Sequence, residues 1–528
     1  MDQKIVTAAL AATHPLLTCV RQVEPEALRN DLLMTGENVA PKMRPTENGG
    51  EMSGSRVHRW SALGLLSVGM LMTTGVQATE KPNIIFILVD DLGYGDLGCY
   101  GQDKILTPRI DQMAAQGMRF TQAYAGSAVC APSRCSLLTG MHNGHNRIRD
   151  NVPHGVALRP DDVTVAEVLK KAGYRTAAIG KWSLGDTGTW GVPNAQGFDY
   201  WYGELDQDLA INYYPETLWE NERMVILQHL TMMNDVGIMV GNRAGAREEY
   251  APDLFVQKAK AFIRQNSQHP FFLYLATTLP HYSEYPPDSP DHFEVPNDKP
   301  YSNRDWPQSA KNYAAMVSRI DHSVGEVLDL LRDMGIDRNT IVLFSSDNGP
   351  YDHPVTQFFK SSGGLRGGKR DLYEGGIRIP LIVRWPGTVA PGQVSELVWA
   401  FWDFLPTAAE LAGLPQPHGI DGISVAPTLL GSPNGQKHHE FLYWDYGHVR
   451  QTYMQAVRLG DWKGVRNRVD APIELYDLEK DAGETRNVAQ GHPDIVEQIA
   501  GIMATAATNS EDYPILSRGS AKIPPGVD

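Results

Sequence analysis

The stretch that decides the fold is NIIFILV, residues 83–89, which is followed directly by Asp90 and Asp91. An uninterrupted apolar run of this length is typical of a strand buried on both faces of a parallel sheet. Ligands of open α/β sheets gather at the carboxyl ends of the strands. The two adjacent carboxylates therefore stand where a binding site is expected.

Outward from this segment, helical and strand patterns alternate along the chain. Helical periodicity is found at residues 108–117, 164–172, 253–265 and about 310–334, and strand patterns at 175–179, 271–276 and 340–344. A further strand at 381–385 and a helix near 401–412 extend the series. This alternation predicts an α/β fold with a large, mostly parallel sheet flanked by helices.

The C-terminal part of the chain has a different pattern. Residues 415–440 are rich in Pro, Gly and His, and short strand patterns at 441–444, 454–458, 462–466 and 474–478 precede a helix at 494–506. We therefore expect a catalytic domain over residues 79–425 and a smaller α+β domain over residues 426–528.

The N-terminus predicts export. Residues 52–78 combine basic residues, a short apolar run and a small-residue cleavage site, as a signal peptide does. The alternative is an ordinary buried apolar helix. Residues 1–51 precede this segment and are interpreted as a spurious or disordered extension, with translation starting at Met52. The mature protein is then periplasmic or secreted, without a stable membrane span.

Composition narrows the class of protein. The 528 residues carry a formal net charge of −15, which argues against nucleic-acid binding. A local cluster of cations can still bind an anionic substrate. Only four cysteines are present, and a disulfide between Cys99 and Cys135 is left open.

A second acidic pair has the same relation to a strand as the first. Asp347 and Asn348 follow the strand expected at 340–344. Three carboxylates and an amide oxygen suit a hard cation, either Ca²⁺ or Mg²⁺. One such pair is most often only a turn, but two pairs that each close an apolar strand favour a metal site.

The segment CAPSR, residues 130–134, contains the candidate nucleophile. Pro132 suits the first position of a helix, which we expect to run over residues 133–139 and to end at Gly140. Cys130 is then expected just before the helix N-terminus, where negative charge is stabilised, with Arg134 nearby. Taken by itself, a cysteine such as Cys130 is more often a buried structural residue.

Further candidates are two glycine-flanked lysines and one histidine. Lys181 follows a strand, Lys369 lies in LRGGK, and His281 follows the strand at 271–276. Glycines permit close approach of backbone to a ligand. Glu374 and Arg378 are expected to form a supporting ion pair.

Taken together, these motifs resemble the sulfatase family, of the bacterial exported, arylsulfatase-like type, over about residues 81–510. The resemblance implies an alkaline-phosphatase-like fold and hydrolysis of sulfate esters, on a sulfated small molecule or glycan. It implies that a maturation enzyme converts Cys130 to formylglycine, and that Ca²⁺, or less commonly Mg²⁺, is bound. The implied metal ligands are Asp90, Asp91, Cys130, Asp347 and Asn348; the implied catalytic residues are Cys130, Arg134, Lys181, His281 and Lys369.

The chain departs from the family where a proton-accepting histidine is usual. Many sulfatases have histidine where Ser183 stands, and some bacterial relatives carry histidines at the positions of Leu209 and Ile211. His142 or His145 could supply the base instead, or activity could be low. Tyr213 and Tyr214 are further candidates for substrate binding, through stacking on a sugar ring.

Two other functions remain open from the sequence. One is a phosphomonoester or phosphodiester hydrolase of the same superfamily, against which the implied single metal and the CAPSR cysteine argue. The other is a catalytically weak or silent sulfatase-like protein that binds sulfated glycans.

Overall fold

A computed structural model of the chain describes residues 81–152, 155–207, 209–227, 231–233, 239–242, 247–450 and 452–515. The expected N-terminal extension and signal peptide lie outside the described residues. All the described residues belong to one compact unit. Within the described ranges, no helix combines the length and the apolar character needed to cross a bilayer.

The centre of this unit is an eleven-stranded sheet in the order β12-β2-β11-β10-β1-β9-β3-β4-β5-β6, with β13 paired to β2. Its middle strands β10, β1, β9, β3 and β4 are all parallel. The strands are β1 (Asn83–Val89), β2 (Met118–Tyr124), β3 (Arg175–Lys181), β4 (Tyr200–Glu204), β5 (Thr217–Glu220), β6 (Arg223–Ile226), β9 (Phe271–Ala276), β10 (Thr340–Ser346), β11 (Arg378–Arg384), β12 (Gln393–Ser395) and β13 (Trp399–Ala400). The mostly parallel sheet predicted from the alternating patterns is confirmed.

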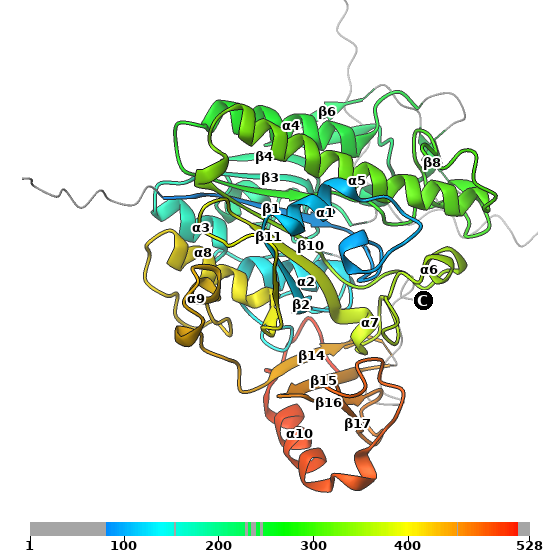
Figure 1. Cartoon of the computed structure of the whole chain (residues 1–528), viewed down its shortest axis with the longest axis vertical. Helices are drawn as coiled ribbons and strands as arrows, with labels where there is room; N and C mark the ends of the chain where they lie inside the picture. The colour runs from blue at the N-terminus through cyan, green and yellow to red at the C-terminus, as the bar shows by residue number, and fades with distance from the viewer. Residues whose placement is uncertain are drawn as a thin grey trace, which may run out of the picture. The chain divides into compact units, whose positions relative to one another are not determined.

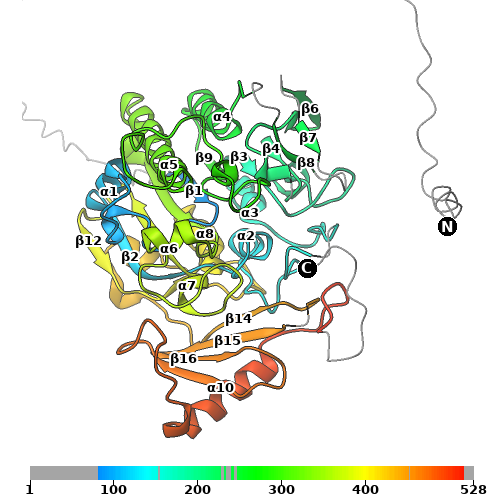
Figure 2. The same ribbon diagram turned by 90° about the vertical axis from the view of Figure 1, so that its right-hand side faces the viewer.

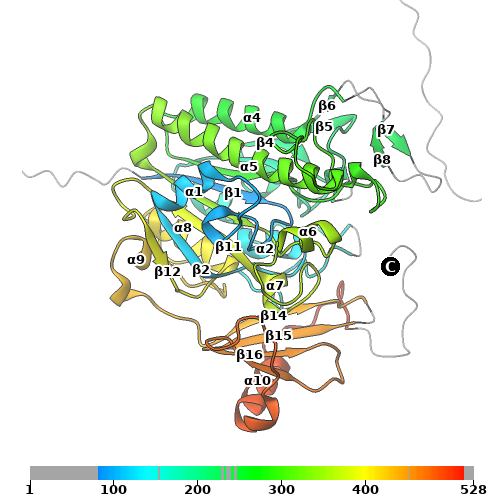
Figure 3. The ribbon, with the colours of Figure 1, turned by 45° about the vertical axis from the view of Figure 1, so that its right-hand side comes forward.

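Helices cover both faces of this sheet. Successive residues of a strand point to opposite faces, and in the central strands the residues on both faces are apolar. Ile85, Ile87 and Val89 of β1 pack with α1 (Pro108–Ala115), α4 (Ala251–Asn266) and α5 (Gln308–Asp333). Residues 84, 86 and 88 pack with α2 (Cys130–Thr139), α3 (Val165–Lys171) and α8 (Phe404–Leu411). Figures 1 and 3 show these two helical layers on either side of the strands.

A smaller antiparallel sheet follows near the C-terminus, in the order β14-β15-β16-β17. It consists of β14 (Leu442–Tyr446), β15 (Met454–Leu459), β16 (Trp462–Arg466) and β17 (Glu474–Asp477), and α10 (Pro493–Thr505) packs on it (Figure 2). Lys463 of β16 is buried between Glu374 and Glu484, at 2.9 and 3.1 Å. Arg378 forms the expected ion pair with Glu374, at 3.3 Å. The boundary at residues 425/426 stays a prediction.

The remaining elements are short. They are α6 (Pro354–Phe359), α7 (Glu374–Ile377), α9 (Ala426–Leu429), the strand pair β7 (Thr231–Met233) and β8 (Met239–Asn242), and eight 3-10 turns in the described chain: η1 (Gly98–Tyr100), η2 (Pro193–Gln196), η3 (Leu209–Ile211), η4 (Pro290–His292), η5 (Asp337–Asn339), η6 (Phe401–Asp403), η7 (Pro433–Gly435) and η8 (Ala489–Gly491). The cysteines at 99, 130 and 135 are all free, so no disulfide joins Cys99 to Cys135.

Candidate active site

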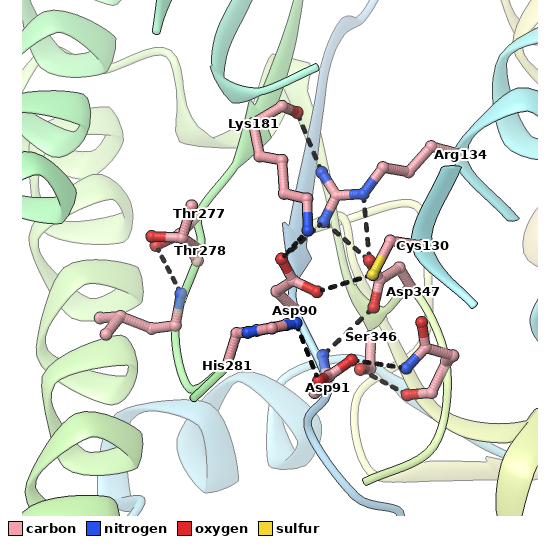
Figure 4. Close-up of polar contacts among 12 residues, drawn as sticks. Asp90, Asp91, Cys130, Arg134, Lys181, Thr277, Thr278, His281, Ser346 and Asp347 are labelled. Atoms are coloured by element: carbon pink, nitrogen blue, oxygen red, sulfur yellow. Dashed lines mark hydrogen bonds and ion pairs between the residues drawn. The ribbon is translucent and has the colours of Figure 1, made fainter. Parts of the chain in front are cut away.

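Four parallel strands and one helix bring the predicted site residues together. Asp90 and Asp91 follow β1, Lys181 ends β3, His281 follows β9, and Asp347 follows β10. The carboxyl ends of parallel strands meet at one edge of a sheet, and the N-terminus of α2 points its first residue, Cys130, at the same edge. Figure 4 shows these side chains converging.

Helix α2 begins at Cys130 itself, with Val129 as N-cap, and not after Pro132 as expected. Gly140 ends it with φ +73°, as predicted. The Cys130 thiol donates to Asp90 Oδ1, 3.4 Å away, and is fully buried. Burial, reinforced by the Asp90 carboxylate, raises the pKa of this thiol to about 12. The encoded thiol is therefore protonated at neutral pH and is a poor nucleophile.

Oxygen atoms form the acidic side of the site. The Asp91 N–H donates to Asp347 Oδ1 (3.2 Å), and Asn348 Nδ2 donates to Asp91 Oδ1 (2.7 Å). Burial and the neighbouring Asp90 raise the pKa of Asp347 to about 7. The Asn348 Oδ1 atom is buried and has no hydrogen-bond partner among the described residues. An orphaned amide oxygen beside three crowded carboxyl groups fits a hard divalent cation.

One group of potential ligand atoms lies within 4.8 Å of one another: those of Asp90, Asp91, Cys130 and His281. Three of these residues were predicted as metal ligands and His281 was not. Asp347, a predicted ligand, lies outside that group but is joined to Asp91 by the hydrogen bond above. Asp91 also has φ +63°, a strained conformation of the kind found at functional sites.

Two buried cations lie on the Asp90 side. Arg134 donates through Nε and Nη2 to Asp347 Oδ2 (3.0 and 2.8 Å) and through Nη1 to the Lys181 carbonyl (2.9 Å). Lys181 Nζ donates to Asp90 Oδ2 (2.7 Å). Burial opposes ionisation of Asp90, but the charges of Lys181, Arg134 and Lys369 outweigh it and hold its pKa well below the usual range.

The third cation, Lys369, is paired with His281 on the Asp91 side. Lys369 Nζ donates to Asp91 Oδ2 (2.8 Å) and to His281 Nε2 (2.9 Å). The other ring nitrogen, Nδ1, lies 2.6 Å from the Tyr282 carbonyl, which can only accept, so Nδ1 carries the hydrogen. Burial and Lys369 lower the pKa of His281 to about 4, so the ring is neutral.

His142 and His145 lie at the opposite end of α2 from Cys130. Ten helical residues separate these two ends by about 14 Å at 1.5 Å per residue. Their rings stack on each other at 4.2 Å, and His145 Nδ1 lies 2.9 Å from Asp421 Oδ1. Contrary to the expectation from the sequence, neither histidine is therefore placed to serve as the base at residue 130.

These two histidines and Asp421 also place three possible ligand atoms within 4.8 Å of one another. However, His142 Nδ1 accepts the Gly144 N–H, so the hydrogen of the neutral ring is on Nε2, the nitrogen that faces Asp421. A metal on Nε2 would force a hydrogen onto Nδ1 against that N–H. The cluster is therefore structural.

Tyr213 and Tyr214 are buried in the core and offer no ring face for sugar stacking in this structure. The Tyr213 hydroxyl donates to the carbonyls of Thr278 (3.0 Å) and His281. Tyr213 therefore holds the segment that carries His281, which corrects the expected substrate contact.

Ser183 has φ +66°, and its hydroxyl is buried without a partner in the described part of the chain.

One residue beside the site was missed by the sequence reasoning. Glu204 ends β4, next to Lys181 in the sheet, and is 3% exposed. Its only signal in the sequence was a carboxylate at the end of a strand, and that strand was itself not predicted.

Comparison with known proteins agrees with this geometry. Residues 82–414 match the sulfatase family, and residues 367–507 match the N-sulphoglucosamine sulphohydrolase C-terminal family. The chain belongs to the sulfatase family and is a sulfuric ester hydrolase.

Several relatives are similar over most of their length. An N-acetylgalactosamine-6-O-sulfatase of Bacteroides thetaiotaomicron is 32% identical over 504 residues, covering 82% of this chain and 94% of the relative. Human arylsulfatase A is 34% identical over 470 residues, covering 80% and 87%. The crystal structure of Ps i-CgsB in complex with k-i-k-neocarrahexaose superposes with a TM-score of 0.68 at 28% identity, covering 82% of this chain and 94% of that chain.

Proposed function

We propose that this sulfatase acts on a sulfated carbohydrate after export to the periplasm or beyond, with its nucleophile made from Cys130. The observation that carries the proposal is the convergence of three cations, a neutral histidine and an acidic metal-type cluster on the buried Cys130 side chain. Because the pKa of the thiol is raised to about 12, the unmodified cysteine is unsuited to attack sulfur. Conversion to formylglycine by a maturation enzyme would supply a hydrated aldehyde as nucleophile.

The residues proposed to hold a metal are Asp90, Asp91, Asp347 and Asn348, together with side chain 130. An all-oxygen set favours Ca²⁺, with Mg²⁺ as the alternative. The cation would offset the mutual repulsion of the carboxylates and stabilise negative charge on the nucleophile.

The cations have separate roles in this proposal. Arg134 holds Asp347 and the end of β3 in place through its three hydrogen bonds. Lys181 and Lys369 lie on opposite sides of the acidic cluster, bound to Asp90 and Asp91, and would stabilise charge on the sulfate oxygens. The Lys369–His281 pair shares one hydrogen across 2.9 Å and would donate a proton to the departing alcohol.

A polar cavity beside Cys130 supports a carbohydrate leaving group. It is a hollow open to solvent with a cavity volume of about 40 Å³, and its lining includes Ala131, the residue next to the nucleophile. Its polar lining is formed by Asp150, Asn151, Ser183, Asp186, Asp206, Gln207 and Tyr513. Carboxyl, amide and hydroxyl groups suit the hydroxyls of a sugar ring. One relative is named as an N-acetylgalactosamine-6-O-sulfatase, and another was crystallised with a neocarrahexaose. Both point to the same class of substrate.

Two measurements test the proposal on protein expressed with a maturation enzyme. Mass spectrometry of the peptide containing residue 130 is expected to show formylglycine. Sulfate release is expected from N-acetylgalactosamine-6-sulfate or from sulfated carrageenan oligosaccharides. A matured protein that releases sulfate from neither class would refute the carbohydrate assignment. Unmodified cysteine in material from a host with the maturation machinery would refute the nucleophile.

A further inference from the structure

Glu204 is a buried acid that the roles described above leave unused. It is 3% exposed, and neither carboxyl oxygen has a hydrogen-bond partner among the residues that the structure describes. Leaving a buried carboxyl group unpaired costs several kcal/mol by ordinary desolvation. Its retention at the edge of the active site therefore calls for a function.

The backbone places Glu204 beside Lys181. Strands β3 and β4 are parallel, with Lys181 directly opposite Glu204, and the Trp182 N–H donates to the Glu204 carbonyl (3.0 Å). Residues in direct register on adjacent strands project from the same face, with the strands about 4.8 Å apart. The Glu204 side chain therefore lies on the face from which Lys181 reaches Asp90.

A matched pair of glycines sets how closely the two strands approach each other. Gly180 and Gly203 precede Lys181 and Glu204 and have φ +108° and +153°. A Cβ on Gly203 would lie 2.0 Å from the Gly180 carbonyl oxygen, and one on Gly180 would lie 1.9 Å from the Ala276 oxygen. Both positions therefore require glycine, and together they set the alignment of the two strand ends.

The electrostatic surroundings suit a proton acceptor. Burial raises the pKa of Glu204 well above its ordinary value, and Asp90 and Asp206 act in the same direction, while Lys181 alone opposes them. A carboxylate with a raised pKa is a stronger base than an exposed one, as general base catalysis near neutral pH requires. Lys181 Nζ can donate three hydrogens, and one of them is used by Asp90.

The site lacks the usual base on this flank. Ser183 does not accept a proton at neutral pH, and His281 is on the other flank, bound to Lys369. We propose that Glu204, acting through Lys181, accepts the proton that is removed when sulfate is released. This inference rests on the proposed formylglycine-dependent function.

In this transfer each bond that breaks is matched by one that forms. Lys181 Nζ is bound to Asp90 and forms no ion pair with Glu204 in this structure, so the relay requires the ammonium to turn from Asp90 towards Glu204. A hydroxyl hydrogen of side chain 130 then passes to Lys181 Nζ while one ammonium hydrogen passes to a Glu204 oxygen. The O–H electron pair becomes the C=O bond of the aldehyde, and the electrons of the broken C–O bond leave with the sulfate. Lys181 remains an ammonium, and Glu204 becomes a neutral acid that returns its proton to solvent.

The variants Glu204→Gln and Glu204→Asp test this assignment on matured protein. For Glu204→Gln we expect kcat for sulfate release to fall at least tenfold, while the first equivalent of alcohol is still released in a rapid burst. We expect partial recovery in Glu204→Asp, and an acidic limb of the kcat profile that is present in the wild type and absent in Glu204→Gln. Equal loss of burst and turnover, an unchanged pH profile, or a kcat within threefold of wild type would overturn the proposal.

A control variant separates this role from buried charge in general. Glu484→Gln makes the same change at another buried acid. Burial and Glu374 raise the pKa of Glu484 to about 7, although Lys463 opposes them. Glu484 contacts none of the residues around Cys130. It should lose stability but keep the wild-type burst and pH profile. Loss of the acidic limb in this variant would count against Glu204.

A readout on unmatured protein keeps this test distinct from that of the proposed function. Difference infrared spectroscopy of wild type against Glu204→Gln, with Cys130 unmodified, follows the Glu204 carboxyl group directly. We expect its protonated band to persist well above the pH at which an ordinary glutamate ionises. Titration at the ordinary pH would refute the Glu204 assignment alone, whereas absence of sulfate release by matured wild type would refute the proposed function.

Discussion

Replacing Arg134 by lysine tests how far the site depends on the geometry of one buried cation. The guanidinium makes three hydrogen bonds of 2.8 to 3.0 Å, two to Asp347 and one to the Lys181 carbonyl. The lysine ammonium keeps the charge, but it lacks the planar fork of the guanidinium and can therefore retain only one of these bonds. Losing two hydrogen bonds to charged groups, each worth about 1.5 kcal/mol at the low end, should cost about 3 kcal/mol.

The matched control is Arg384→Lys. Arg384 is also buried and also makes three hydrogen bonds, two to Asp337 and one to Gln116, but it lies at the far end of β11 from the site. Both variants should therefore lose stability by a similar amount in urea unfolding. Only Arg134→Lys should also lose activity, because only Arg134 orients Asp347 and the strand end of Lys181.

Sulfate release from an aryl sulfate surrogate, measured below the unfolding transition, is the decisive assay. If the whole 3 kcal/mol appeared in the transition state, kcat/KM would fall about a hundredfold. We expect a loss of at least tenfold in Arg134→Lys and less than threefold in Arg384→Lys. Equal activities in the two variants would refute the argument that Arg134 positions the site.

Three further predictions concern stability. Chelation should lower the melting temperature, and Ca²⁺ at about a hundred times its dissociation constant should restore about 2.7 kcal/mol; an unchanged melt would contradict the metal site. Gly203→Ala should destabilise the protein more than Gly335→Ala, because both have positive φ but only the Gly203 Cβ meets a neighbouring atom, a difference that urea unfolding measures. The pKa of His439 is raised, since Asp403 at 2.7 Å outweighs the effect of burial. Protonated His439 therefore stabilises the fold below about pH 6, and this contribution is lost as pH rises through the folded pKa. His439→Gln should accordingly cost more in melting temperature at pH 5.5 than at pH 9, and equal losses would contradict the pairing.

The strands of the sheet centre were predictable because their signal is local. The strand at 271–276 has the same bounds in the structure, and the strand at 340–344 is longer by Ser345 and Ser346. A run of apolar residues is buried on both faces wherever it is placed in such a sheet, so its pattern survives in the sequence. The last two strands at one side of the sheet, β5 and β6, are partly exposed and carry no comparable pattern.

Residues outside the strand ends were harder to place. Tyr213 and Tyr214 have the composition of a sugar-binding loop, yet both are buried in the core, and His142 is separated from Cys130 by the length of α2. Distance along the chain says little about the direction in which a helix or loop carries a side chain. Such positions depend on packing between segments far apart in sequence.

The sequence by itself determined the chemistry of the site: the acidic pairs that close two apolar strands, CAPSR at the start of a helix, and the glycine-flanked lysines. These are local motifs, and strand ends of a parallel sheet meet at one edge. Only the tertiary structure decided how the protons are held. The contact between Lys369 and His281, the raised pKa of the Cys130 thiol and the position of Glu204 opposite Lys181 in the sheet all depend on burial and on non-local strand register, which no single segment encodes.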